Sequence, residues 1–506
     1  MSKIFSFFVF SLCVWKSTQG VAPYNVALVE YLMDDEVVSK LSPLDLSNRN
    51  ARKYSEIVRN IKEKNNNKLD LVLFPESTLN SKTALFVDQD GLTFVPSPEE
   101  SVIPCNTSSV AFASFFKLLS CTAQKYETYL VVNLKEKYYC KGDVCESNQL
   151  KRFNTDVVFD RTGKVVARYR KYNLFGEFGT STTKEPELIT FETDFGITFG
   201  IFTCFDILFQ SPPIDLIKKG VRHFLFPTYW FPELPFLSTI QSQQMWSQGT
   251  NVTLLTASAA HPKSGSGGLG IFHGLQGNVA TVVSPYTDNR FLLREVPDIN
   301  SFNSVCSTNV NDDKAKEMDQ YELSLEDLSD YSHIKLDIET SKTIKETLCQ
   351  QQNNISLCCE FTIEADVNET KLNDNKNKYN YYLAVRSGYR THAHGIYRTS
   401  MEICSLLACT GDSISTCGER FPNYDQVSWP LTFNRIEISA QFPNTEKRIQ
   451  FPNSLLADFS PIQPSCTIWK SEENDTAHTI RRTFASKAPV TKLLTYAIYG
   501  RNFALD

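Results

Sequence analysis

The feature that most constrains the fold is an alternation of strand-like and helix-like segments through the first three hundred residues. Continuous apolar runs at 24–32, 69–74 and 252–258 are typical of strands that are covered on both faces. Between the first two runs, apolar residues around 54–61 recur at i, i+3, i+4 and i+7, as in an amphipathic helix, and a second helix is expected at 110–119. This order predicts a mixed α/β core with helices on its outer faces.

The composition changes past about residue 300. Residues 307–335 begin with an acidic, polar stretch and are expected to form a linker. In 336–506, short strand-like pieces alternate with turn residues, and eight of the chain's 14 cysteines lie from Cys306 onward. We therefore expect a large domain at 23–306, as the catalytic domain, and a smaller β-rich domain at 336–506 that is cross-linked by disulfides.

The N-terminus predicts export. Residues 1–22 contain Lys3, an apolar run at 4–15 and then small and polar residues, which is the layout of a secretory signal peptide cleaved near Gly20 or Ala22. No later segment has the apolar length of a membrane span. The mature chain is therefore expected to be secreted and extracellular, without a transmembrane segment.

Export changes how the cysteines are interpreted, because disulfides persist outside the cell. Cys13 leaves with the signal peptide, and the remaining 13 form an odd set that requires a free thiol or an intermolecular bond. If Cys204 is the free thiol, the other twelve could form six disulfides, and Cys140 with Cys145 could close a hairpin tip. The sequons that suit this compartment are Asn106, Asn251, Asn354, Asn368 and Asn474.

The charge of the chain argues against polyanionic partners. The formal net charge is -6, from 51 basic and 57 acidic residues, and no long basic run is present. Nucleic acid and anionic membrane surfaces are therefore not expected as partners. The sequence makes no prediction of the oligomeric state.

Three reactive residues follow predicted strands in the first domain. Glu76 comes after the run at 69–74, Lys171 ends a hairpin strand, and Cys204 ends the strand in "GITFGIF". Residues at strand ends of an α/β sheet converge on the crevice where ligands bind. Each also has a structural interpretation: a turn cap for Glu76, a solvated strand edge for Lys171 and an inert buried thiol for Cys204.

Taken in order, the segments "FPE", "RKYNLF", "TCFD" and "FPTYW" resemble the carbon–nitrogen hydrolase (nitrilase) superfamily, and most of all its vanin and biotinidase branch. The resemblance implies an α-β-β-α sandwich with an appended β-rich domain. It also implies a Glu–Lys–Cys triad that acts on amides without a cofactor or a metal. A small-molecule amide is the expected substrate.

The resemblance assigns roles that the chemistry of these residues supports. Cys204 would attack the carbonyl, Glu76 would move the protons, and Lys171 would face the carbonyl oxygen. The remaining expected site groups are the backbone N–H of Phe205 as a second oxyanion donor, Glu177 as a supporting carboxylate, and Tyr229 and Trp230 as substrate contacts.

Within this branch, the resemblance favours hydrolysis of pantetheine to pantothenate and cysteamine. Hydrolysis of biotin amides and acyl transfer to amines stay open as alternatives, as does a secreted binding protein without turnover. A papain-like Cys–His pair with His223 or His261 is disfavoured, since neither lies in a protease-like context. A metal site at His392 and His394 lacks a third nearby ligand.

Overall fold

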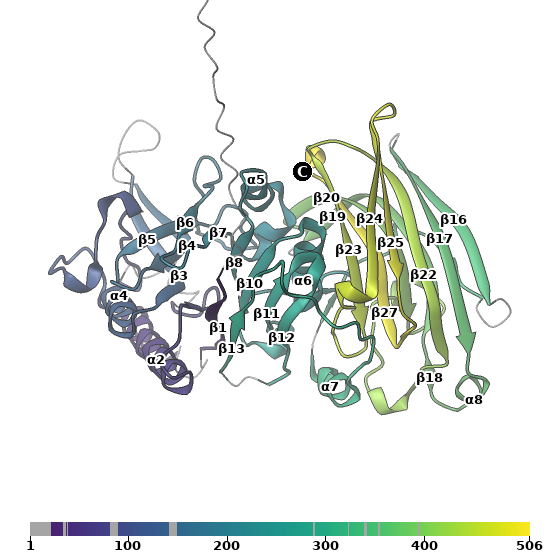
Figure 1. The fold of residues 1–506 in the computed structure, drawn as a ribbon, viewed down its shortest axis with the longest axis horizontal. Coiled ribbons are helices and arrows are strands. Elements are labelled where there is room, and N and C mark those ends of the chain that lie inside the picture. Colours follow the sequence, from purple (N-terminus) through teal and green to yellow (C-terminus); the bar gives the residue numbers. More distant parts are fainter. Residues whose placement is uncertain are drawn as a thin grey trace, which may run out of the picture.

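The computed structural model describes residues 22–33, 37, 39–80, 90–140, 149–286, 289–321, 323–337, 342–352, 355–392 and 395–506. The predicted signal peptide, apart from Ala22, lies outside the described residues, as do Cys145, Asn354 and His394. The N-terminal half forms two six-stranded sheets, and the C-terminal half forms a two-sheet sandwich (Figure 1).

The two N-terminal sheets face each other. The first sheet has the order β13 (Arg290–Val296), β1 (Tyr24–Glu30), β2 (Leu71–Leu73), β3 (Tyr129–Tyr139), β4 (Leu150–Phe159) and β5 (Val165–Arg170). The second has the order β12 (Asn278–Val282), β11 (Leu269–His273), β10 (Thr253–Ser258), β8 (His223–Thr228), β7 (Thr198–Ile201) and β6 (Thr190–Glu192). Strands β1, β2 and β3 run parallel to one another, as do β7, β8 and β10. In each sheet the C-terminal ends of these strands therefore lie on the same side.

Alternation along the strands places one set of side chains between the sheets. Val131 of β3 and Val158 of β4 pack there against Ile201 of β7 and Leu225 of β8. The opposite set, such as Val132 of β3, packs beneath the helices. Because both faces of these strands are covered, the apolar runs are continuous, as the sequence predicted.

Helices cover the outer faces of the two sheets. α2 (Pro43–Lys64) and α4 (Ser114–Tyr126) pack against each other and on the first sheet, and α6 (Thr239–Thr250) lies on the second. The helix expected at 110–119 begins only at Ser114, after Ala113 in an extended conformation, and it runs on to Tyr126. The resulting α-β-β-α sandwich is the predicted architecture.

The C-terminal half is a sandwich of two antiparallel sheets. One contains β15 (Ser332–Lys335), β19 (Asn380–His392), β20 (Tyr397–Cys409), β27 (Leu493–Asn502) and β23 (Arg448–Leu456). The other contains β16 (Thr343–Gln352), β17 (Ile355–Val367), β22 (Leu431–Pro443), β25 (Thr479–Ser486) and β24 (Thr467–Asn474), with β26 (Val490–Thr491) paired to β22. Their facing side chains form a separate apolar core.

The two halves are packed together through α6. The helix lies between the second N-terminal sheet and strand β23 (Figure 1). Gly249 lets the ring of Phe451 approach the helix closely. Residues expected to form a linker are also structured, as α7 (Asp312–Glu317) and β14 (Ser324–Leu325), which pairs in parallel with β9 (Glu233–Leu234). The segment 307–335 therefore packs along both halves.

The cysteine arithmetic is confirmed where the structure describes the thiols. The disulfides join Cys105 to Cys121, Cys306 to Cys466, Cys349 to Cys358, Cys359 to Cys404 and Cys409 to Cys417. Cys204 is the free cysteine of the described part of the chain, and it is buried. The predicted pairing of Cys140 with Cys145 lies outside the described residues.

Candidate active site

The site forms where the inner faces of the two sheets change from apolar to polar side chains. Along β3 the inward residue after Val131 is Asn133, and along the antiparallel β4 the residues that precede Val158 on the same face are Asp156 and Asn154. Asn133 and Asp156 stand opposite each other in the ladder. Because side chains alternate along a strand, these polar groups share the interior of the sandwich at one end.

Lys171 is the centre of a buried cluster of charges at this end. Its Nζ lies 2.8 Å from Glu76 Oε1 and 2.6 Å from Glu177 Oε1. Its side chain is only 1% exposed. Lys135 adds a second cation, with Nζ 3.6 Å from Glu177 Oε2. The structure thus brings together Glu76, Lys171 and Glu177, which the sequence named separately.

Asn154 is a site residue that the sequence analysis missed. Its Nδ2 donates to Glu76 Oε1 at 2.7 Å and to Glu177 Oε2 at 2.8 Å, so one amide holds both carboxylates. One feature of the sequence could have identified it. Asn154 and Asp156 are polar residues on the inward face of a strand that is otherwise expected to be buried. A buried polar residue inside a strand usually has a hydrogen-bonding role.

Cys204 lies at the sharp turn that follows β7. Its φ is +50°, in the left-handed region that residues with a Cβ seldom adopt. The turn starts a short 3-10 helix, Cys204–Leu208, and Cys204 Sγ donates to the Tyr229 carbonyl at 3.6 Å. The Tyr229 N–H donates to Glu76 Oε2 at 2.9 Å. One peptide backbone therefore touches both the thiol and the carboxylate.

The ionisation of the cluster follows from burial and from charge. Burial favours a lower pKa for Lys171, but the carboxylates of Glu177 and Glu76 outweigh it and hold this pKa well above its usual value. Burial opposes ionisation of Glu177 as well, yet Lys171 and Lys135 lower its pKa to about 2. Burial and the charge of Glu76 raise the pKa of the Cys204 thiol to about 12. Near neutral pH the site holds a protonated thiol beside an ammonium group.

Asp206 holds the turn that carries Cys204 through hydrogen bonds. It accepts from the backbone N–H of Thr203 at 2.9 Å, from the hydroxyl of Tyr169 at 2.7 Å and from the backbone N–H of Asn173 at 2.9 Å. Burial raises the pKa of Asp206 to about 6. Its carboxylate ties the turn that carries Cys204 to the strand that leads to Lys171.

Comparisons with known proteins identify the family of this chain. The carbon-nitrogen hydrolase family model matches residues 43–249, and the model of the vanin C-terminal domain matches 321–506. Vanin-like protein 1 of Drosophila melanogaster is 36% identical over 481 residues, which cover 89% of this chain and 81% of that protein. The chain belongs to the vanin family of carbon–nitrogen hydrolases.

Named relatives with assigned activities also match this vanin-family chain. Human pantetheinase is 29% identical over 430 residues, covering 81% of this chain and 75% of its own length. Biotinidase of Takifugu rubripes is 29% identical over 471 residues, covering 86% of this chain and 85% of its own length. The protein is accordingly an amidohydrolase of the carbon–nitrogen hydrolase class.

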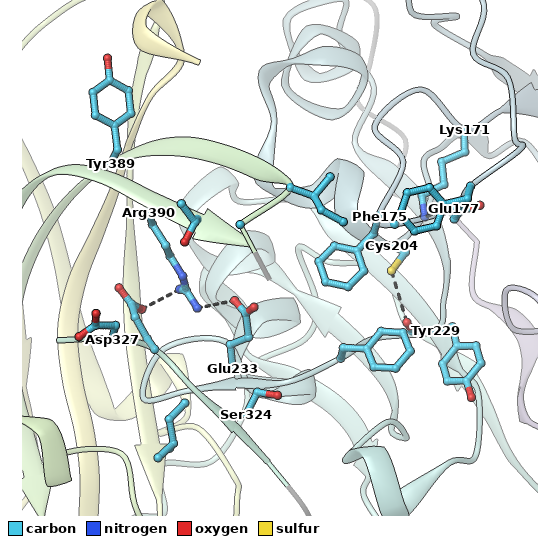
Figure 2. A pocket seen from close by; sticks show the side chains of 18 of the residues that line it. Lys171, Phe175, Glu177, Cys204, Tyr229, Glu233, Ser324, Asp327, Tyr389 and Arg390 are labelled. Atoms are coloured by element: carbon cyan, nitrogen blue, oxygen red, sulfur yellow. Dashed lines mark hydrogen bonds and ion pairs between the residues drawn. The ribbon is translucent and has the colours of Figure 1, made fainter. Parts of the chain in front are cut away.

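The candidate active site of this vanin-family protein opens into a large cavity between its two halves. The cavity has a volume of about 1190 Å³ and is lined by Cys204 and Lys171 at one end and by Arg390 and Tyr389 of β19 at the other. Figure 2 shows Lys171, Glu177 and Cys204 facing the cavity from one side and Arg390 with Asp327 from the opposite side. The wall that the C-terminal half contributes was not predicted from the sequence.

Aromatic rings cover one side of this cavity. Tyr229 stacks on Phe231 with ring centres 5.1 Å apart, and Phe231 stacks on Phe175 at 5.9 Å. Trp230, named with Tyr229 from the sequence, is not among the residues that line the large cavity. Its indole is buried, donates to the Leu237 carbonyl and borders a small recess next to Cys204.

The described histidines that were considered from the sequence do not line the large cavity, although His392 borders the small recess next to Cys204. His223 starts β8 and contacts Tyr24, and His261 contacts Ser264, so neither lines the cavity. His392 is bonded to Glu233 and Thr399. Over the described ranges, no group of three or more His, Cys, Asp or Glu side chains is arranged to hold a metal ion.

Other sequence features can be placed briefly. Four of the sequon asparagines are exposed: Asn106, Asn251, Asn368 and Asn474. Within the residues that the structure covers, no helix has the length and apolar character needed to cross a membrane.

Proposed function

We propose that this protein hydrolyses a linear carboxamide through a thioester on Cys204, and that the substrate is pantetheine, cleaved to pantothenate and cysteamine. The observation that carries the proposal is the pair of contacts made by the Tyr229 backbone, to the Cys204 thiol and to Glu76. A base, a thiol and a buried cation in one cavity are the groups that acyl transfer needs.

In the first half-reaction, Glu76 takes the proton from the Cys204 thiol while sulfur attacks the carbonyl carbon. The carbonyl oxygen becomes an oxyanion, and Lys171 stabilises it because its ammonium is buried and held by two carboxylates. The Phe205 N–H, in the first turn of the helix that begins at Cys204, is the proposed second donor. The carbon–nitrogen bond then breaks, and Glu76 delivers its proton to the leaving amine.

In the second half-reaction, water replaces the amine. Glu76 takes a proton from the water molecule, whose oxygen attacks the thioester carbonyl. The carbon–sulfur bond breaks, the thiol regains the proton, and the carboxylic acid leaves. Glu177 assists by holding Lys171 in place at 2.6 Å rather than by moving protons, since its pKa of about 2 keeps it ionised.

Substrate binding is assigned to the cavity lining. The stacked rings of Tyr229, Phe231 and Phe175 offer an apolar wall beside Cys204, suited to the aliphatic part of an acyl group. We also propose that the protein is secreted and glycosylated. The five disulfides and the exposed sequon asparagines support this, because both features belong to the extracellular compartment.

The test is a product-release assay with pantetheine and biocytin side by side, with Cys204→Ala as the control. We expect turnover of pantetheine by the wild-type protein and none by the variant. Faster turnover of biocytin would replace the substrate and keep the mechanism. Well-folded protein that turns over neither amide, while still binding one of them, would reject the proposed substrates.

A further inference from the structure

We propose that a buried chain of hydrogen bonds sets the position of the Cys204 turn relative to Glu76, and that Thr203, Asp156 and Asn133 are therefore positioning residues. The inference rests on the proposed function, because it concerns the attack by Cys204. All three side chains are at most 1% exposed. None of them lines the cavity.

The chain begins directly before the nucleophile. The hydroxyl of Thr203 donates to Asp156 Oδ2 at 2.5 Å, which links the second sheet to the first. The other oxygen, Asp156 Oδ1, accepts from Asn133 Nδ2 at 2.8 Å. Asp156 thus accepts one hydrogen bond from the side of each sheet, and its two oxygens set the distance between the two donors.

The chain continues from Asn133 to the base. Asn133 Nδ2 also donates to Asn154 Oδ1 at 2.6 Å, and Asn154 Nδ2 donates to Glu76 Oε1 at 2.7 Å. Asn133 Oδ1 accepts from the backbone N–H of Ser77, the residue after Glu76, at 2.9 Å. Asn133 is therefore connected to Glu76 in two ways. Its Nδ2 bonds to Asn154, which bonds to the Glu76 carboxylate, and its Oδ1 accepts from the Ser77 N–H next to Glu76.

The orientation of both amides in the chain is fixed. Both amide nitrogens donate twice: Asn133 Nδ2 to Asn154 and Asp156, and Asn154 Nδ2 to Glu76 and Glu177. Turning either amide over would place donor against donor, so the network has one arrangement. A network with a single arrangement holds its two ends at a defined separation.

Burying the carboxyl group of Asp156 costs free energy, and close packing alone does not explain why it is there. Among the ion pairs of the described residues, none involves Asp156, so its carboxylate is buried without a cation. Burial raises the pKa of Asp156 to about 7. Apolar residues fill the equivalent inward positions one step along, at Val131 and Val158. A carboxyl group at this position is explained by the two hydrogen bonds that it accepts, one from the side of each sheet.

A second tie limits how far the turn can move. Tyr169 of β5 donates to Asp206 Oδ2 at 2.7 Å and so also joins the first sheet to the Cys204 turn. Loss of the Thr203 hydroxyl should therefore displace the thiol from Glu76 without unfolding the turn. A misplacement of about 1 Å can reduce a rate by about 10²-fold.

The experiment compares Thr203→Val, which removes the hydroxyl, with Thr203→Ser, which keeps it. For Thr203→Val we expect kcat on pantetheine to fall by about tenfold or more, with KM changed by less than about twofold. The rate of Cys204 alkylation by iodoacetamide in the folded protein should fall in parallel. Thr203→Ser, which keeps the hydroxyl donor to Asp156, should stay within about threefold of wild type.

Thr253→Val is the matched control. It removes another buried hydroxyl, which bonds to His273 at 3.0 Å away from the cavity, and it should lower the melting temperature without slowing alkylation or turnover. If Thr203→Val does not fold, Asn133→Ser, which is too short to bridge both neighbours, takes its place with the same expected losses.

The outcomes separate this inference from the proposed function. Normal kcat and normal alkylation in Thr203→Val would overturn it, and so would equal losses in Thr203→Ser or Thr253→Val. If the wild-type protein cleaves neither amide, the substrate proposal fails. Slower alkylation in Thr203→Val alone would then still support the positioning role.

Discussion

Lys171 and Glu177 form a buried ion pair in which Nζ and Oε1 are 2.6 Å apart. The same ammonium lies 2.8 Å from Glu76, so one cation is shared by two carboxylates. This arrangement keeps Lys171 charged despite its burial, since the pKa of Lys171 is held well above its usual value. A permanent cation next to the thiol is suited to an oxyanion and unsuited to proton transfer.

The ion pair predicts how Glu177→Gln changes stability with pH. The pKa of Glu177 is lowered from 4.5 to about 2, so the folded state gains stability from it above pH 4.5 and loses that gain as the pH falls toward 2. The difference in unfolding free energy between wild type and Glu177→Gln should therefore be largest at neutral pH and shrink from pH 5 to pH 3. Urea unfolding at several pH values measures it. Glu185→Gln, at an exposed position, is the control and should show no such trend.

The charges around the Cys204 thiol predict that two substitutions shift its pKa in opposite directions. Burial and the charge of Glu76 raise the pKa of Cys204 to about 12, whereas Lys171 lowers it. Glu76→Gln should therefore move the alkylation-rate profile to lower pH, and Lys171→Met should move it to higher pH. Turnover should nevertheless fall by at least about 10³-fold in Glu76→Gln, because the base is lost. Shifts of the same sign in both variants would contradict this account of the charges.

Cys204→Ala tests the nucleophile directly. We expect loss of at least about 10⁴-fold in kcat with little change in melting temperature, because the thiol makes only weak hydrogen bonds, to Tyr229 and Thr228. Cys204 is the free cysteine of the described part of the chain. Mass spectrometry after alkylation without reduction should therefore find label on Cys204 in the wild-type protein and none in the variant. Residual turnover near the wild-type level would show that another group attacks the amide.

The junction between the halves predicts a large effect at Arg390. This buried guanidinium lies across the cavity from Cys204 (Figure 2). It is paired with Glu233 and, at 2.7 Å, with Glu326. Arg390→Met leaves two carboxylates buried without their cation and should lower the unfolding free energy by about 3–5 kcal/mol. Chemical unfolding measures the change.

Arg435→Met is the control for Arg390. Arg435 pairs with Glu437 at 3.0 Å on the surface, where such pairs contribute about 1 kcal/mol or less. Equal effects of the two substitutions would show that the Arg390 pairs do not stabilise the junction.

Several features were determined by the sequence alone. The periods of apolar residues specify strands and helices because burial on one or two faces leaves a local pattern, and β1, β2, β8 and β10 follow it closely. The odd number of cysteines required one exception to pairing, and the short segments around Glu76, Lys171 and Cys204 named the reactive groups. These signals are local, so no knowledge of the fold was needed to find them.

Other features were decided only by the tertiary structure. The bond from Asn154 to Glu76 spans 78 positions, and the wall around Arg390 belongs to a different half of the chain from Cys204. No local pattern reports which polar side chains meet, because their contacts depend on how two sheets and two domains pack. The sequence also grouped Trp230 with Tyr229, yet the chain after β8 places the Trp230 ring in the core and the Tyr229 ring at the cavity. Residue type and order named the chemistry, whereas long-range packing determined which groups surround it.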